Sequence, residues 1–168
     1  STGEDNTAVG RSALQSNIDG SANTATGRDS LFTNTTGGYN TASGYRALYF
    51  NLNGYLNTAV GQASLQSNTS GNSNVAMGSA ALSNNNTGNY NVGVGETALS
   101  TNNSGSNNTA VGRGAGSNIL TGSGNTLLGA DSSASTTSVN NEFSLFSGST
   151  LRLRITDTNI ATFEGIVK

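Results

Sequence analysis

Apolar and small side chains recur along this chain with a fixed spacing of 17 residues. Each repeat unit begins at an asparagine, and positions within a unit are numbered 1 to 17 from that residue. The eight asparagines at position 1 are Asn6, Asn23, Asn40, Asn57, Asn74, Asn91, Asn108 and Asn125. Six units have leucine at position 9, namely Leu14, Leu31, Leu48, Leu65, Leu82 and Leu99. An unbroken period of this length predicts one structural unit per repeat, stacked so that neighbouring units share a core.

The first arm of each unit has the alternation of a β-strand. It reads Asn-Thr-Ala-Val-Gly at residues 6–10, so positions 2 and 4 project from one face. The second arm carries Ala or Ser at position 8 in all eight units, before the position-9 residue. A helix is disfavoured because so short a unit contains so much Gly, Asn, Ser and Thr. We expect a thin core made of the position-9 leucines, the Val, Met and Leu side chains at position 4, and the small residues at positions 3 and 8.

Two glycine columns mark the corners of each unit. Position 5 is always glycine: Gly10, Gly27, Gly44, Gly61, Gly78, Gly95, Gly112 and Gly129. Position 15 is glycine in seven units: Gly20, Gly37, Gly54, Gly71, Gly88, Gly105 and Gly122. Glycine supplies the positive φ that a tight corner needs. The sequence therefore predicts an all-β fold, a parallel β-solenoid (β-roll) of eight 17-residue coils over residues 1–141.

Asparagine also recurs at position 12, in the six units that carry the leucine. Stacked Asn side chains can form amide ladders, in which each carboxamide bonds to those above and below it. Asparagine also suits turns, because its side chain bonds the local backbone. We interpret position 1 as a ladder, and both interpretations stay open for position 12.

Oppositely charged residues support the stacking register. Asp29 and Arg46 share position 7 in successive units, and Glu96 and Arg113 share position 6. We expect each pair to lie within salt-bridge reach, where an exposed pair contributes at most about 1 kcal/mol.

The sequence changes character towards its C-terminal end. Unit seven has Gly116 in place of the leucine and Ile119 in place of the asparagine, as atypical terminal repeats do. Beyond residue 141 the apolar pattern predicts short strands at 143–146, 151–155 and 160–167. We interpret residues 142–168 as a small C-terminal β-strand cap or joint.

Composition alone would predict disorder, because 10% of the residues are charged and 33% are apolar. The repeat overrides that expectation. A net charge of −2 gives no electrostatic footprint for nucleic acid, and no apolar run is long enough for membrane insertion. The chain has no cysteine or histidine to act as nucleophile or base, and its carboxylates do not recur with the repeat. We therefore expect no enzyme activity, no cofactor and no metal site.

Six of the ten aromatic residues lie in units two and three. They are Phe32, Tyr39, Tyr45, Tyr49, Phe50 and Tyr55. Phe32 and Tyr49 share position 10 in adjacent units, so their rings should stack. Tyrosines clustered on a rigid surface suit contact with a glycan or a protein partner. The alternative is that these rings pack between protomers of a self-associating rod.

The repeat resembles that of trimeric autotransporter adhesin heads. The resemblance lies in Ala8-Val9-Gly10, Ala13, Gly20 and Asn23-Thr24-Ala25, and it extends over residues 6–141. The pattern is also similar to shafts of phage tail-fibre-like proteins, in which a segment like Leu151-Arg152-Leu153-Arg154-Ile155 often precedes a self-cleaving chaperone. The unit of 17 residues is longer than that of the adhesin head by about three. The resemblance implies a left-handed roll and a homotrimer.

The hypothesis that follows is a structural or adhesive fibre segment, a homotrimeric surface adhesin or tail-fibre-like shaft. Its location would be extracellular, on a cell or virion surface. An alternative is a subunit of a self-assembling extracellular filament, in which the cap of one chain docks on the open end of the next. A third hypothesis is an ice-binding solenoid, because threonine fills position 2 in six of eight units, although only Thr24-Ala25-Thr26 supplies the Thr-x-Thr pattern of two threonine ranks.

Overall fold

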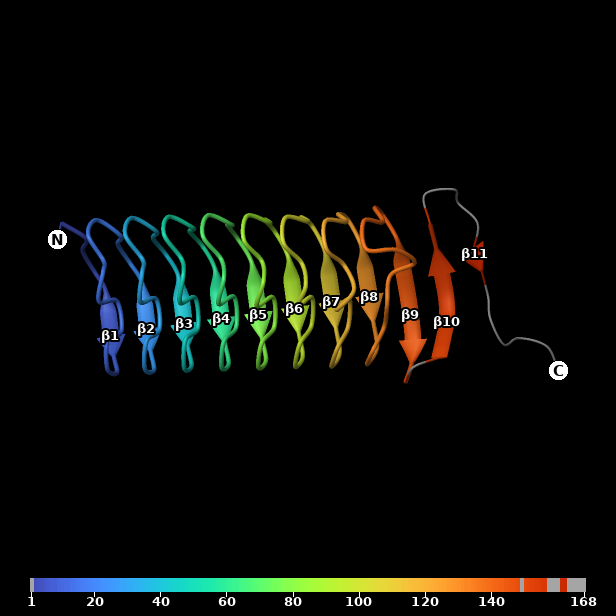
Figure 1. Ribbon diagram of the computed structural model, residues 1–168, viewed down its shortest axis with the longest axis horizontal. Helices are drawn as coiled ribbons and strands as arrows, with labels where there is room; N and C mark the ends of the chain where they lie inside the picture. Colours follow the sequence, from blue (N-terminus) through green and yellow to red (C-terminus); the bar gives the residue numbers. More distant parts are fainter. Residues whose placement is uncertain (1, 149, 157–160, 163–168) are drawn as a thin grey trace.

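The structure, a computed structural model, describes residues 2–148 and 150–156, together with the backbone of 161–162. Eleven strands lie in chain order in one sheet, and the described residues contain no helix. Figure 1 shows the strands side by side along a rod. The first eight strands are β1 Thr7–Val9, β2 Thr24–Thr26, β3 Thr41–Ser43, β4 Thr58–Val60, β5 Val75–Met77, β6 Val92–Val94, β7 Thr109–Val111 and β8 Thr126–Leu128. The last three are β9 Phe143–Ser147, β10 Thr150–Ile155 and β11 Ala161–Thr162.

Each repeat unit forms one coil of a solenoid. Strands β1 to β9 pair in parallel at the spacing of one unit, so that Ala42 lies opposite both Ala25 and Ala59. Backbone hydrogen bonds also join the second arms, for example from the Leu48 N–H to the Ser64 carbonyl at 3.0 Å. A given unit position therefore forms a column along the rod. These findings confirm the predicted parallel β-solenoid of eight 17-residue coils.

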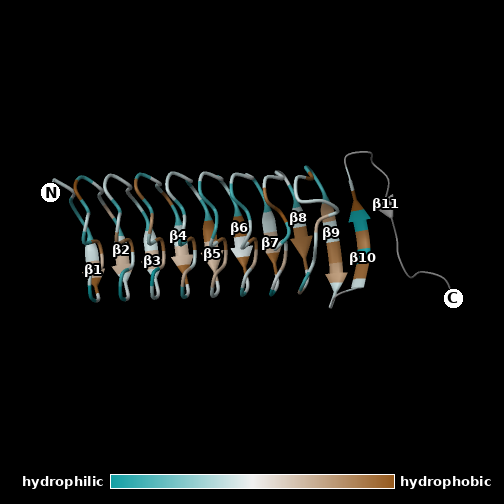
Figure 2. Ribbon diagram, in the orientation of Figure 1, coloured by the Kyte–Doolittle hydropathy of each residue, from teal (hydrophilic) through white to brown (hydrophobic). Residues whose placement is uncertain are grey.

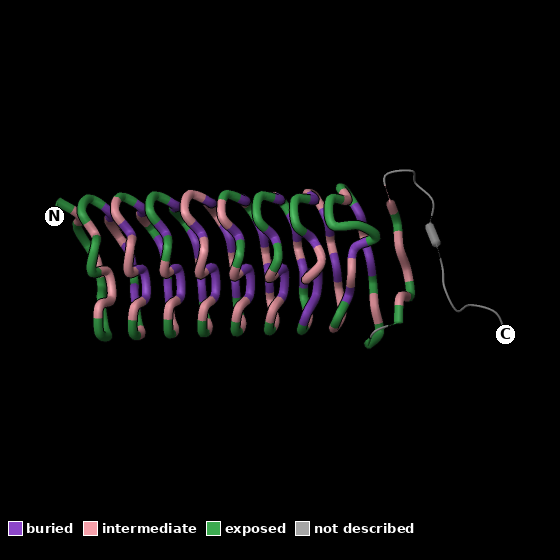
Figure 3. The backbone as a smooth tube through the Cα atoms, in the orientation of Figure 1, coloured by how far each residue is buried: buried purple, intermediate pink, exposed green. Residues whose placement is uncertain are grey.

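The core contains one large and two small side chains per coil. In coil four these are Leu65, the strand residue Ala59 and the second-arm residue Ser64, all with no exposed surface. Figure 3 shows the buried segments recurring from coil to coil. The central residue of each strand from β2 to β8 is buried in the core, so positions 2 and 4 face outward.

The expectation that position 4 belongs to the core was wrong. Met77 and Val111, both at this position, are 45% and 41% exposed. The predicted alternation is correct, but the opposite face of the strand is buried. The reason is the narrowness of the coil: a Cβ added to Gly93, at position 3, would lie 3.3 Å from the Leu82 side chain. A leucine on the second arm therefore leaves room only for a small residue on the strand.

The two glycine columns have different causes. Gly61, at position 5, has a φ of +127°, a conformation that residues with a Cβ rarely adopt. The position-15 glycines do not have positive φ, which corrects the expectation for that column. A Cβ on Gly54 would lie 2.5 Å from the Gly71 carbonyl oxygen and 2.4 Å from Asn51 Oδ1. Glycine at position 15 therefore permits the close approach of successive coils.

Residues at positions 7, 9 and 17 adopt the left-handed conformation, in most coils without glycine. The φ angle is +51° at Leu48, +53° at Ala80 and +57° at Tyr90. In coil seven the same three positions hold Gly114, Gly116 and Gly124. That coil lacks the position-9 leucine, and the fully buried Ile119 supplies its large apolar side chain. The apparent degeneration of unit seven therefore preserves the path of the coil.

The C-terminal segment continues the stack and then reverses strand direction. β9 pairs in parallel with β8, and β10 pairs antiparallel with β9. Glu142 takes the place of the position-1 asparagine, and its N–H donates to Asn125 Oδ1 at 2.9 Å. Its buried carboxylate accepts a hydrogen bond from the Ser144 hydroxyl at 2.7 Å and pairs with Arg154 at 3.2 Å. These contacts attach the antiparallel strands to the last coil.

The strands expected at 143–146 and 151–155 correspond to β9 and β10. Of the strand expected at 160–167, the structure describes only β11, which pairs antiparallel with β10. The rest of that expected strand lies outside the described residues.

Candidate functional site

The interior of the rod is occupied by two columns of hydrogen-bonded carboxamides. At position 1, Asn40 Nδ2 donates to Asn23 Oδ1 at 3.1 Å and to the Gly54 carbonyl at 2.8 Å. At position 12, Asn51 Nδ2 donates to Asn34 Oδ1 at 2.7 Å and to the same Gly54 carbonyl at 3.0 Å. The ladder predicted for position 1 is confirmed, and position 12 serves both as a ladder and as a turn. The interior is therefore a scaffold, and the surfaces are the candidates for function.

The first candidate surface is the outer face of the sheet, formed by positions 2 and 4 of strands β1 to β9. None of these eighteen residues is charged. Threonine predominates at position 2, whereas position 4 is mostly apolar from Val60 to Leu145. Figure 2 shows the strands becoming more hydrophobic from β1–β3 towards β8. At position 4 of this face the structure exposes apolar side chains that were expected in the core.

The second candidate surface contains four of the six predicted aromatic residues and is called the aromatic cluster: Phe32, Tyr45, Tyr49 and Phe50. The predicted stacking of Phe32 on Tyr49 is confirmed, with ring centroids 5.1 Å apart and planes 3° from parallel. Phe50 meets the edge of Tyr49 at 4.6 Å and 81°. The Arg46 guanidinium lies 5.2 Å from the ring centroids of both Tyr45 and Tyr49, so cation–π contacts join the cluster.

Tyr39 and Tyr55 lie apart from the aromatic cluster. They occupy positions 17 and 16, in the loop that leads into the strand, and are 68% and 46% exposed. Their rings make no stacking contact with the other four in the described part of the chain. The six aromatic residues predicted as one patch therefore do not form a single cluster of contacting rings.

The two predicted charge pairs have different outcomes. Asp29 lies 4.0 Å from Arg46, as expected, and 3.2 Å from Arg28. Arg113 pairs with Asp131 and not with Glu96, so that prediction was wrong. The reason is Gly114: its missing side chain leaves the space into which the Asp131 carboxylate projects. These pairs lie largely at the surface and contribute little to stability.

Two further features bear on function. In the part of the chain that the structure describes, no three Asp or Glu side chains come together as a metal site. No helix there is long and apolar enough to cross a membrane.

Comparison of the chain with protein-family models, with curated proteins and with solved structures finds no match. The functional argument therefore depends on the surfaces of the solenoid.

Proposed function

We propose that this chain is a non-catalytic, adhesive rod segment that self-associates side by side as a homotrimer. The observation that carries the proposal is the outer face of the sheet, an uncharged surface with a column of exposed apolar side chains. Val60, Met77 and Val111 at position 4 are 37%, 45% and 41% exposed. Soluble monomers rarely expose apolar patches that continue over several strands, so such a face indicates an interface.

Within the part of the chain that the structure describes, little else is available to cover this face. Each coil is only 17 residues long, and its core is already filled by one leucine and small side chains. A second copy presents the same flat, uncharged surface, so the contact requires no burial of an unpaired charge. The number three, and the extracellular location on a cell or virion surface, come from the resemblance to trimeric adhesin heads and tail-fibre-like shafts.

The experiment compares Met77→Lys with Gln62→Lys by light scattering at low micromolar concentration. Both substitutions place a lysine at an exposed site, but only Met77 is on the outer face of the sheet. The parent and Gln62→Lys are expected at three times the 16.9 kDa mass of one chain. Met77→Lys is expected as a monomer, because a buried ammonium without a partner strongly opposes association.

Two results would contradict the proposal. A monomeric parent would leave the outer face free, and a trimeric Met77→Lys would place the interface elsewhere. A long polymer of uniform width would instead support the filament alternative, with residues 142–168 as the joint between chains.

Ice binding is a second candidate, favoured by the threonine rank. Thr7, Thr24, Thr41 and Thr58 lie in register on the exposed face of the sheet. The rank is interrupted by Val75 and Val92, and position 4 adds a second hydroxyl only at Thr26 and Ser43. Thermal hysteresis in the parent, abolished when Thr41 is replaced by lysine, is the result that would favour this candidate over the adhesive rod.

A further inference from the structure

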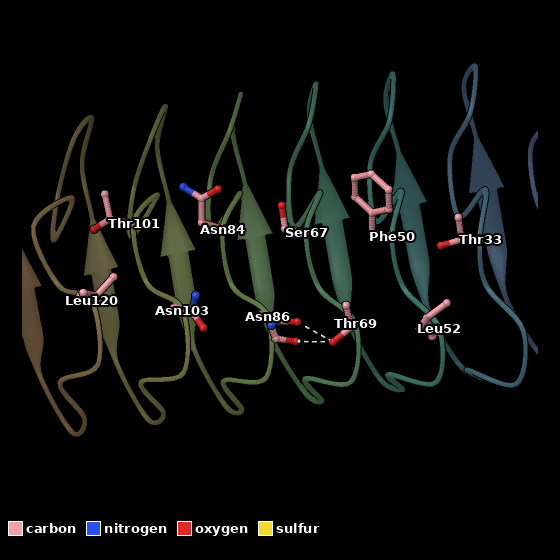
Figure 4. A pocket seen from close by; sticks show the side chains of 10 residues that line it. All are labelled: Thr33, Phe50, Leu52, Ser67, Thr69, Asn84, Asn86, Thr101, Asn103 and Leu120. Atoms are coloured by element: carbon pink, nitrogen blue, oxygen red, sulfur yellow. Dashed lines mark hydrogen bonds between the residues drawn. The ribbon is translucent and has the colours of Figure 1, made fainter.

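A groove runs along the rod on the surface of the second arm. Because position 12 points into the core, positions 11 and 13 on either side of it point outward. Their side chains form two parallel ranks, from Thr33 to Thr101 at position 11 and from Leu52 to Leu120 at position 13 (Figure 4). The space between these ranks, called the side groove, has a volume of about 710 Å³.

The middle of the side groove is polar but uncharged. Ser67, Asn84, Asn86 and Asn103 line it, and no charged residue does. Thr69 Oγ1 donates to Asn86 Oδ1 at 2.5 Å, which leaves the Asn86 amide N–H groups available. Asn84 and Asn103 are exposed in this lining, and within the described part of the chain their carboxamides form no hydrogen bond to a protein group. Several donors and acceptors therefore face the groove without a protein partner.

Apolar side chains lie towards both ends of the side groove. Phe50 and Leu52 lie near one end, next to Thr33, and Leu120 lies at the other end, next to Thr101. Phe50 is 46% exposed, and the edge contact with Tyr49 restrains the orientation of its ring. Tyr49 itself stacks on Phe32 and makes a cation–π contact with Arg46. The aromatic cluster thus presents one ring to the groove in a fixed position, which lowers the entropy lost when a ligand binds.

We infer that the side groove binds a linear, neutral oligosaccharide chain lying parallel to the rod axis. This inference deepens the proposed adhesive function by naming the class of ligand. Carboxamide and hydroxyl groups both donate and accept hydrogen bonds, as sugar hydroxyls do. The apolar C–H face of a sugar ring packs on an aromatic ring such as Phe50.

The periodicity of the side groove matches a polymer. Successive coils at strand spacing present one side chain of each rank about every 4.8 Å, so the four steps between the five side chains of a rank extend about 19 Å. A ligand with its own short repeat can contact several equivalent Asn and Thr side chains along that length. A compact small molecule would use only part of the site.

Other occupants fit the side groove less well. An extended peptide that adds to a sheet requires free backbone groups at the sheet edge. Here the backbone groups of one coil are hydrogen-bonded to the next coil; for example, the Thr69 N–H donates to the Asn86 carbonyl at 3.0 Å. An anionic polymer or nucleic acid requires Lys or Arg, which the lining lacks. A hydrocarbon chain would bury the Asn84 and Asn103 carboxamides without hydrogen bonds, which is unfavourable.

The test is a calorimetric titration of the full chain with linear hexasaccharides of glucose, xylose, mannose and N-acetylglucosamine, and with hexagalacturonate as the anionic probe. At least one neutral hexasaccharide is expected to bind, and hexagalacturonate is expected not to bind. Phe50→Ala is expected to weaken binding about tenfold. The double variant Asn86→Leu, Asn103→Leu is expected to abolish it, because it keeps side-chain size and removes the hydrogen-bonding groups.

The matched control is Tyr90→Ala, which truncates a 61% exposed ring outside the groove and should leave binding unchanged. The inference is overturned if no neutral hexasaccharide binds, if the Asn double variant binds like the parent, or if hexagalacturonate binds as tightly. Light scattering on the same samples separates the two proposals. A trimer that binds no sugar overturns only the side groove, and a monomer that binds sugar overturns only the trimer.

Discussion

Residues at positions 7, 9 and 17 adopt a left-handed backbone conformation that residues other than glycine normally avoid. An L-residue in this region is unfavourable by about 1–2 kcal/mol relative to a right-handed conformation. The solenoid imposes this geometry in each coil, including on the core residue Leu65 at a φ of +48°. Sequence analysis could not predict it, because leucine and alanine normally avoid the region. The sequence carries one signal of it, the glycines of unit seven at Gly114, Gly116 and Gly124, of which only Gly116 was considered above, as a mark of an atypical terminal repeat.

Replacing a left-handed alanine by glycine should therefore stabilise the fold. Ala80→Gly removes a strained Cβ at a φ of +53°, and we expect the free energy of unfolding to rise by about 0.5–1 kcal/mol. The adjacent Ala81→Gly is the control: Ala81 is fully buried and has no positive φ, so its loss should destabilise by about 1 kcal/mol. Urea denaturation at one fixed protein concentration measures both. Equal effects of the two variants would contradict the assignment of strain to position 7.

The strand and the asparagine columns differ in how far sequence could predict them. The alternation of each strand was predictable, but the buried face was not, because the inward residue is the small Ala59 and the outward residue the apolar Val60. The limited space across the narrow coil, and not the hydrophobicity of the side chains, determines which face of the strand is buried. The position-1 ladder was predictable, since a carboxamide repeated at every coil can bond to its own copies.

The position-1 ladder should contribute strongly to the stability of the stack. Asn57 Nδ2 donates to Asn40 Oδ1 and to the Gly71 carbonyl, and its Oδ1 accepts from the Asn74 backbone and side chain. Asn57→Ala leaves the buried partners of this carboxamide without hydrogen bonds, and each unpaired group lowers the free energy of unfolding by about 1–3 kcal/mol. We expect the free energy of unfolding to fall by about 3 kcal/mol or more in urea denaturation. The exposed Asn53→Ala should change it by less than about 0.5 kcal/mol. A variant at Asn57 as stable as that control would show that water replaces the ladder.

For the rod as a whole, the repeat period determined the architecture but not the surfaces. Eight units in one phase left little choice other than stacked coils. The contact surfaces depend on where each position lies around the coil, which the period does not specify. Tyr39 and Tyr55 were grouped with Phe50 by sequence, and the coil separates them. The side groove had one signal, the inward asparagine at position 12, which implies that positions 11 and 13 point outward.

Removal of a complete coil should shorten the rod without changing its fold. Deletion of residues 57–73 joins Leu56 to Asn74, so position 17 is again followed by position 1 and each column stays in register. Because repeat stabilities add along a solenoid, we expect an unchanged circular dichroism spectrum and a urea m-value lower by about one eighth. Small-angle scattering should give a length shorter by about 4.8 Å, the rise of one coil.

The out-of-phase control removes one residue more. Deletion of residues 57–74 joins Leu56 to Val75, so one coil has no position-1 asparagine. The next strand must then either shift by one residue, which turns the core face outward, or leave a gap in the ladder. This variant should therefore lose much more stability than the in-phase deletion, although it differs by a single asparagine. If both deletions unfold at the same urea concentration, the rod does not depend on the register of its columns, and the 17-residue period is not the structural unit.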